Sequence, residues 1–181
     1  MSNIKILVTG VSSQVGSALC ARALSAGVSV VWFDDSILNS LQLESIKAAI
    51  VSFKPSYVVN TASYSVVDLA EDNAQKSYFS NHDVAMVLAQ ACHELALPLL
   101  HLSTDYVFDG EQKVPYKEDS FSAPVNRFGV AKLAAEQTIR QYCSDHIILR
   151  VGWIFSAQGN NFVLRTLKQL QEHHQVKAVS D

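Results

Sequence analysis

The stretch Ile-Lys-Ile-Leu-Val-Thr-Gly-Val-Ser-Ser-Gln-Val-Gly, residues 4–16, decides how the N-terminal part of this 181-residue chain folds. Its first five residues, Ile4–Val8, form a short apolar, β-branched run that predicts a strand, and the run stops at Thr9-Gly10. From Val15 to Leu24 the apolar residues recur at helical spacing, and Gly27 supplies a stop signal. The stretch therefore predicts a strand, a glycine turn and a helix.

The same alternation continues along the chain. Further strands are expected at Val28–Phe33 (fully buried), Tyr57–Asn60, Leu99–Ser103, Ile147–Val151 and Val176–Val179, and further helices at Leu41–Phe53, Val84–Leu95, Asn126–Tyr142 and Asn161–Glu172. Residues 105–125 are expected to form a long functional loop. Alternating strands and helices predict an α/β fold with a parallel sheet covered on both faces. The right-handed crossover rule then favours a doubly wound, Rossmann-type architecture.

Composition limits the classes of protein. With 49% hydrophobic residues and a net charge of −3, the chain is too apolar for a disordered segment, and its length suits one domain, residues 1–181. Acidic residues (17) outnumber basic ones (14), so a nucleic-acid partner is not expected. Three scattered cysteines predict neither a disulfide framework nor a metal site. Without a signal peptide or an apolar run of ~18 residues, no membrane partner and a cytoplasmic location are expected.

The first turn is a candidate phosphate-binding loop. Gly10 and Gly16 occupy the outer positions of a Gly-x-x-Gly-x-x-Gly pattern, and Ser13 stands at the middle position. Such turns place the pyrophosphate of a dinucleotide at a helix N-terminus. Asp34, after the second expected strand, can accept hydrogen bonds from an adenosine ribose and favours NAD over NADP. The alternatives are a turn that merely needs glycine and a solvated loop acid.

A second group of candidates follows the expected strand Leu99–Ser103. Ligands of open α/β sheets bind outside the carboxyl ends of the strands, so Thr104 and Asp105 are expected to point toward a site. The alternative is that both residues only cap a turn. On the next expected helix, Phe128 and Lys132 are four residues apart and share a face.

With these pieces aligned, the sequence resembles the extended short-chain dehydrogenase/reductase superfamily, and within it the sugar-nucleotide reductases typified by dTDP-4-dehydrorhamnose reductase. The resemblance covers the whole chain. It rests on Val59-Asn60-Thr61-Ala62, Tyr64 with Val67-Asp68 and Ala70-Glu71, the Ser103–Gly110 run, Ala123-Pro124-Val125-Asn126, the run from Gly129 to Glu136, Gly152-Trp153 and Gly159-Asn160-Asn161-Phe162.

The resemblance implies reduction of a 4-keto group on a nucleotide-linked sugar by hydride from NAD or NADP. Thr104 matches the hydroxyl that hydrogen-bonds the reacting carbonyl, and Lys132 matches the lysine that holds the nicotinamide ribose. The other implied positions contact the substrate (Asp105, Tyr106 and Trp153) or the cofactor (Gln14, Val15, Ala62, Ser63 and Ser65).

Two departures from the family pattern affect these expectations. Phe128 stands where the family has its proton-donating tyrosine, so catalysis is expected to be impaired unless Tyr106 or an ordered water replaces that acid. Ser13 adds a side chain where backbone approaches phosphate. A non-catalytic nucleotide-binding or regulatory module is the alternative function.

The family comparison also affects the expected extent of the chain. The family's C-terminal substrate lobe is expected to be largely missing from this chain. Trp153, Phe155 and Phe162 should therefore be exposed or covered by another subunit, which a homodimer would supply.

Overall fold

The computed structural model describes residues 4–33 and 35–176 of the chain. Within these residues one parallel sheet contains β1 (Lys5–Thr9), β2 (Ser29–Val31), β3 (Tyr57–Asn60), β4 (Leu99–Thr104) and β5 (His146–Val151). The strand order is β2-β1-β3-β4-β5. The expected doubly wound α/β fold is confirmed. The expected strand Val176–Val179 lies outside the described residues, apart from Val176.

The helices follow the strands in the expected alternation. They are α1 (Gln14–Ser25), α2 (Asp35–Asn39), α3 (Leu43–Phe53), α4 (Val67–Asp72), α5 (Ala74–Tyr78), the π-helical turn η1 (Phe79–Asp83), α6 (Val84–Glu94), the 3₁₀ turn η2 (Asp105–Val107), α7 (Arg127–Tyr142) and α8 (Phe162–His173). Three of the longer helices begin where a side-chain oxygen of Ser13, Asn126 or Asn161 accepts a hydrogen bond from the first turn. The short elements α2, α4, α5 and η1 were not expected, because they are too short to show a clear periodicity.

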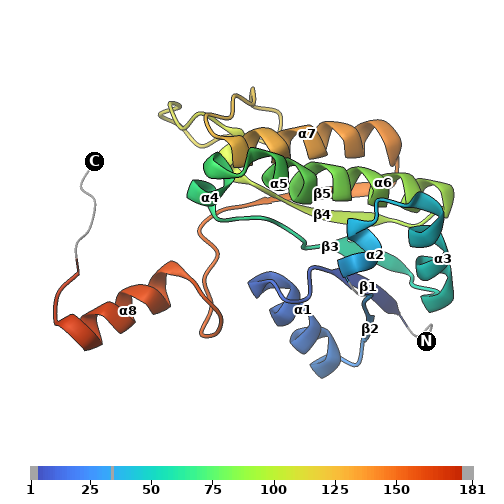
Figure 1. Ribbon diagram of the computed structural model, residues 1–181, viewed down its shortest axis with the longest axis horizontal. Coiled ribbons are helices and arrows are strands. Elements are labelled where there is room, and N and C mark those ends of the chain that lie inside the picture. Colours follow the sequence, from blue (N-terminus) through green and yellow to red (C-terminus); the bar gives the residue numbers. More distant parts are fainter. Residues whose placement is uncertain (1–3, 34, 177–181) are drawn as a thin grey trace.

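The helices are distributed unequally over the two faces of the sheet (Figure 1). Helices α3, α6 and α7 pack side by side on one face, whereas α1 lies on the other face, against β1 and β2. Right-handed crossovers explain this arrangement, because the chain moves one way from β1 to β2 and the opposite way from β2 through β3 and β4 to β5. The expectation of a sheet covered on both faces is therefore wrong for β3–β5, where Tyr57, Ile147 and Leu149 are exposed.

Strand β2 also differs from expectation. It has three residues, none of them fully buried, and the neighbouring Trp32 is exposed. The reason is its edge position, since β2 pairs only with β1 among the described strands. The buried core lies instead between the central strands and the α3–α6–α7 layer, where Leu7, Val58, Leu88 and Leu99 are all at most 1% exposed. Burial of these side chains holds β1, β3 and β4 at fixed positions, so that their carboxyl ends meet.

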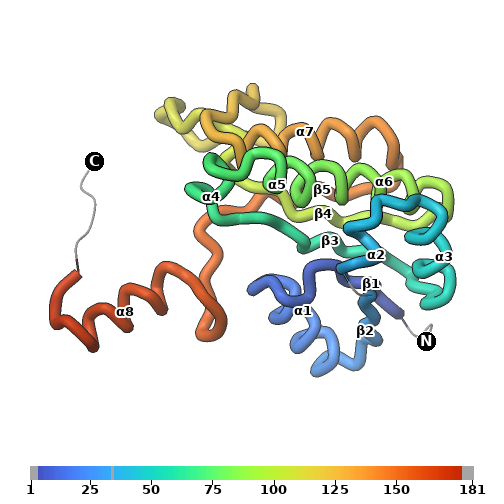
Figure 2. Tube along the Cα trace, in the orientation of Figure 1, coloured from blue at the N-terminus to red at the C-terminus, as the bar shows by residue number. Residues whose placement is uncertain are grey.

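The last described helix projects away from the sheet. The trace in Figure 2 leaves β5, passes the start of α1 and continues outward as α8, which has no fully buried residue. Trp153, Phe155 and Phe162 are 78%, 70% and 54% exposed, which confirms the exposure expected from the sequence. Within the described part of the chain, no helix combines the length and apolar character needed to cross a membrane.

Candidate functional site at the carboxyl edge of the sheet

Two adjoining cavities lie at the carboxyl ends of the central strands. One has a volume of about 300 Å³ and the other about 590 Å³. They share a border formed by Ser13, Gln14, Ser63, Ser65 and Asn160. Strand β2 lies on one side of β1, and β3 lies on the other side. The connections from β1 to β2 and from β2 to β3 therefore run in opposite directions, and the edge between β1 and β3 is the switch point of the fold. Ligands of doubly wound sheets bind at such switch points.

The glycine turn between β1 and α1 forms one wall of this edge. Gly10 has a φ of +70°, a conformation that favours glycine, and a Cβ on Gly10 would overlap the backbone of Ala62. A Cβ on Gly16 would overlap the carbonyl oxygen of Gly10. The two glycines therefore allow the β1–α1 turn to pack directly against the segment that follows β3.

Ser13 occupies the middle of the same turn and caps α1. Its Oγ accepts a hydrogen bond from the backbone N–H of Gly16 at 3.0 Å and lies 3.2 Å from Thr61 Oγ1. The cap satisfies one of the free N–H groups that a helix N-terminus offers to an anion. The serine therefore occupies an N–H group that a glycine at this position would leave open to an anion.

The segment after β3 is held in place by a buried asparagine on the π-helical turn η1. Asn81 Oδ1 accepts hydrogen bonds from Ser63 Oγ at 3.0 Å and from the Tyr64 backbone N–H at 3.1 Å. Asn81 Nδ2 donates to the Tyr64 carbonyl at 3.2 Å. A π-helical turn rotates the residues that follow it, and such turns frequently accompany functional sites. Asn81 was not identified from the sequence, because its partners in the segment after β3 lie 17 or 18 residues away.

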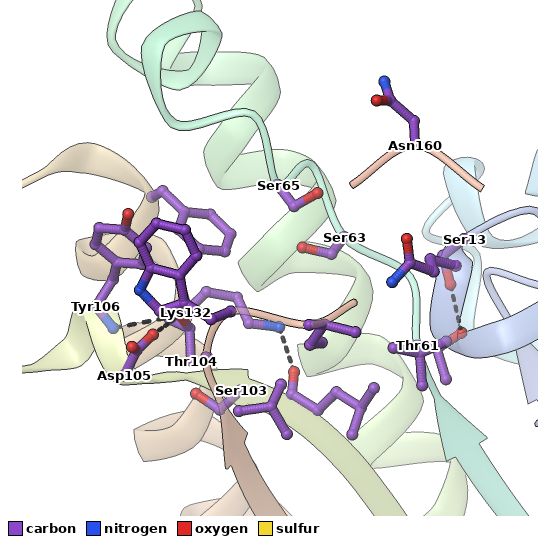
Figure 3. Close-up of a pocket in the computed structure, with 18 residues that line it drawn as sticks. Ser13, Thr61, Ser63, Ser65, Ser103, Thr104, Asp105, Tyr106, Lys132 and Asn160 are labelled. Carbon is purple, nitrogen blue, oxygen red and sulfur yellow. Dashed lines mark hydrogen bonds between the residues drawn. The ribbon is translucent and has the colours of Figure 1, made fainter. Parts of the chain in front are cut away.

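Residues after β4 and on α7 line the smaller cavity (Figure 3). Thr104 ends β4, and its Oγ1 donates to Asp105 Oδ1 at 3.1 Å and accepts from the Tyr106 backbone N–H at 3.2 Å. The Phe128 ring meets the Tyr106 ring edge-to-face, with centroids 5.9 Å apart. Thr104 therefore both caps the turn η2 and lines the cavity, whereas Asp105 lines the cavity without capping a backbone group.

Lys132 lies one helical turn from Phe128, and its side chain is only 2% exposed. Its Nζ donates to the Leu102 carbonyl and lies 3.2 Å from His101 Nε2. Burial lowers the pKa of Lys132 to about 7, although the nearby Glu136 carboxylate acts in the opposite direction. In the structure the lysine therefore contacts the strand β4 from the cavity floor.

Most residues expected at the site lie in these cavities. Ser13, Gln14, Val15, Ser63, Ser65, Thr104, Asp105, Tyr106, Phe128, Lys132 and Trp153 line the smaller cavity, and Gly10 and Ala62 line the larger one. Gly16 packs beneath the turn and is not a lining residue of either cavity. Asp34 lies outside the described residues, so its role stays a prediction, whereas its neighbour Asp35 lines the larger cavity.

The segment 152–161 closes one side of both cavities. Asn161 Nδ2 donates to Gln14 Oε1 at 3.2 Å, which joins this segment to the first turn of α1. Asn160 borders both cavities, and Trp153 has a φ of +49°, which is unusual for a residue with a large side chain. Asn160 belongs to a motif quoted from the sequence but was not named as a site residue. Among the described residues, no group of three His, Cys, Asp or Glu side chains could hold a metal ion.

Fold and site together define a doubly wound α/β structure with two adjoining cavities at its switch point. Residues 4–181 match the family described as "RmlD substrate binding domain". The chain is 36% identical over 178 residues to the dTDP-4-dehydrorhamnose reductase of Burkholderia thailandensis, covering 98% of this chain and 59% of that protein. It is 33% identical over 177 residues to the spore coat polysaccharide biosynthesis protein SpsK of Bacillus subtilis, covering 98% and 62% respectively.

A solved structure shows the same likeness. The dTDP-4-dehydrorhamnose reductase of Bacillus anthracis, solved in complex with NADP, superimposes with a TM-score of 0.89 at 27% identity, covering 96% of this chain and 62% of that one. The chain belongs to the RmlD substrate binding domain family. It spans about 60% of the length of the curated relatives it matches.

Proposed function

We propose that the chain binds a nicotinamide dinucleotide in the two adjoining cavities, as the cofactor-binding part of a reductase for the 4-keto group of a nucleotide-linked sugar. The observation that carries the proposal is that the Gly10–Gly16 turn borders both cavities, while Thr104 and Lys132 line the smaller of the two. The NADP complex of a relative with the same fold supports the choice of ligand. We place this function in the cytoplasm, where the sequence predicts the chain to reside.

The residues around the cavities fit such a ligand. The N-terminus of α1 offers backbone N–H groups to a pyrophosphate, and the first turn of α1 contains no acidic residue that would repel it. Thr104 would hydrogen-bond the reacting carbonyl, Lys132 would hold the nicotinamide ribose, and Asp105, Tyr106 and Trp153 would contact the sugar. When bound, the nicotinamide supplies the hydride. Phe128 has no proton to donate to the carbonyl oxygen, so we expect slow reduction.

Binding of NADH and NADPH to the chain tests the proposal directly. We expect both to quench protein fluorescence, and NADH to bind more tightly on account of Asp34. Ser65→Phe places a ring at the border that both cavities share, and it should weaken binding by about 10-fold or more, or 1.4 kcal/mol. Ser52→Phe, on the exposed surface of α3, is the matched control and should leave binding unchanged. Absence of binding by both dinucleotides would refute the proposal.

Replacing the cap of α1 provides a second test. Ser13→Gly frees the Gly16 N–H for a phosphate oxygen, and it should tighten dinucleotide binding by about 10-fold, since a hydrogen bond to a charged group contributes ~1.5 kcal/mol. The loss of helix stability should be only a few tenths of a kcal/mol. Isothermal titration calorimetry measures the affinity, and Ser25→Gly, at the opposite end of α1 and outside both cavities, is the control. Equal or weaker binding by Ser13→Gly would show that the serine itself contacts the ligand.

A non-catalytic nucleotide-binding or regulatory module is the second candidate function. The observation that favours it is Phe128, because the phenyl ring that lines the cavity keeps its shape while lacking an acidic proton. This candidate predicts dinucleotide binding with no turnover of a 4-keto sugar. Turnover assays with the bound dinucleotide therefore separate the two functions.

A further inference from the structure

A chain of buried hydrogen bonds crosses the sheet beneath the cavity. It runs from Thr9 on β1 through Asn60 on β3 and His101 on β4 to Lys132 on α7. All four residues are at most 2% exposed, and Lys132 also lines the smaller cavity. Neither Asn60 nor His101 has a role in the proposed function described above.

One backbone N–H group determines which atom donates and which accepts in each hydrogen bond of this series. The Ala62 N–H can only donate, and it lies 3.1 Å from Asn60 Oδ1. The Thr9 hydroxyl also donates to Oδ1, at 2.8 Å. The amide nitrogen of Asn60 must therefore face His101, and it donates to Nδ1 at 3.0 Å. The opposite orientation of the amide would place two N–H donors against each other.

The same logic determines the protonation of His101 and of Lys132. An imidazole whose Nδ1 accepts a hydrogen bond, and which is neutral, has its proton on Nε2. That proton is directed at Lys132 Nζ, 3.2 Å away. An ammonium group has three donors and no acceptor, so the nitrogen that accepts from His101 must be a neutral amine. One of its own N–H bonds is donated to the Leu102 carbonyl.

We propose that His101 is a positioning residue that holds Lys132 against β4 as a neutral amine, and that Lys132 takes up a proton from solvent and turns into the cavity when a dinucleotide is bound. The second half of this inference rests on the proposed function. The step is a simple protonation, in which the amine and one solvent proton give an ammonium group. At a pH above the range in which the amine titrates, the positive charge that contacts the ligand's oxygens is therefore generated on binding.

The charges around the lysine agree with this assignment. Burial and then the neighbouring Lys132 hold the pKa of His101 well below 6.5, and burial lowers the pKa of Lys132 to about 7. Glu136 on α7 pairs with Arg140 and with Arg150 of β5. Asp105 on η2 lines the same cavity, and His82 and Asp83 on η1 bond to each other. The packed elements also carry Arg127, which pairs with Glu71 of α4, as well as Asp68, Asp72, Lys76, Tyr78, Tyr106, Tyr142 and His146. Glu136 alone raises the pKa of Lys132.

Nuclear magnetic resonance of the unliganded chain tests the first half. Long-range ¹H–¹⁵N spectra of the imidazoles, assigned with His101→Gln, should show His101 as the neutral Nε2–H tautomer at pH 8.5. In lysine-labelled chain, the side-chain signals assigned to Lys132 with Lys132→Met should titrate near pH 7, not near 10.5. An Nδ1–H or doubly protonated His101 at pH 8.5, or a lysine that titrates near 10.5, would overturn the proposal.

Substitutions of Asn60 and Thr9, which lie at the other end of this series of hydrogen bonds, distinguish a positioning role of His101 from a simple loss of stability. Asn60→Asp presents only acceptors, so we expect His101 to change to the Nδ1–H tautomer and Lys132 to titrate about 1–3 pH units higher. Thr9→Val removes a buried hydrogen bond but leaves Ala62 to orient Asn60, so neither signal should change. Matching spectra for Asn60→Asp and the unaltered chain would contradict the positioning role.

Proton uptake tests the second half. Calorimetry of NADPH binding in buffers of different ionisation enthalpy should show about one proton taken up at pH 8.5 and almost none below pH 6, where the lysine is already charged. No uptake at pH 8.5, with binding intact, would overturn the coupling. A chain that binds neither dinucleotide would refute the proposed function, whereas the imidazole spectra would still decide the state of His101.

Discussion

Phe128→Tyr should raise the rate of 4-keto sugar reduction by about 10²–10⁴-fold, the usual contribution of a general acid. The ring at position 128 lines the cavity together with Thr104 and Lys132, so a phenol there would lie at the same cavity as the hydroxyl for which we propose carbonyl binding. The nearby lysine, once charged, would favour proton release from the phenol. The fold should not change, because the substitution adds one oxygen atom at a cavity wall.

The rate is best measured in a chimera in which the chain replaces the matching 59% of the Burkholderia thailandensis reductase. Single-turnover oxidation of NADPH with dTDP-4-dehydrorhamnose gives the chemical step. Phe121→Tyr, at a highly exposed ring, is the matched control and should leave the rate unchanged. An unchanged rate for Phe128→Tyr with normal NADPH binding would show that another group, such as Tyr106 or a water molecule, donates the proton.

Glu136→Ala should lower the free energy of unfolding by about 3–5 kcal/mol, because it leaves a partly buried guanidinium without its partner. The carboxylate is fully buried and accepts hydrogen bonds from Ser103 Oγ at 2.6 Å and from Arg150 Nε and Nη2 at 2.8 and 2.7 Å. Arg140 adds a fourth, at 3.0 Å. These contacts join α7 to the ends of β4 and β5, so urea unfolding of the variant should show an earlier midpoint.

The decrease in the free energy of unfolding caused by Glu136→Ala should depend on pH in a defined direction. Burial by itself raises the pKa of Glu136, but the hydrogen bonds from Arg150 and Ser103 outweigh it and hold the pKa below the ordinary value of 4.5. The contribution is therefore fully present above pH 4.5 and decreases as the pH falls through the lower folded-state value. The difference between the unaltered chain and Glu136→Ala should shrink in that acidic range. Glu172→Ala, in an exposed pair with Lys168, should cost no more than ~1 kcal/mol.

The parts of the candidate site that lie in short motifs directly after a strand could be predicted from the sequence. Gly10 and Thr104 each follow a strand, and the carboxyl ends of parallel strands meet at one edge. The residues that support them could not be predicted in this way. Asn81 and His101 act on partners 17 to 41 residues away.

The exposed sheet face shows a similar limit. Alternation of strands and helices is consistent with helices on either face, so periodicity alone could not assign α3, α6 and α7 to the same side. That assignment follows from the strand order together with the handedness of crossovers. The short length and partial exposure of β2 likewise depend on its position at the edge of the sheet, which its apolar residues do not reveal.

The sequence by itself determined the strand–turn–helix units and the pairing of Phe128 with Lys132 on one helix face. These features depend on interactions between residues close together in the chain. Only the tertiary structure decided that the hydroxyl of Ser13 lies against Thr61, and that Lys132 turns toward His101. The physical reason is that these contacts join residues far apart in the sequence. Their partners, and the protonation state of a buried side chain such as Lys132, are determined by which strands and helices pack together.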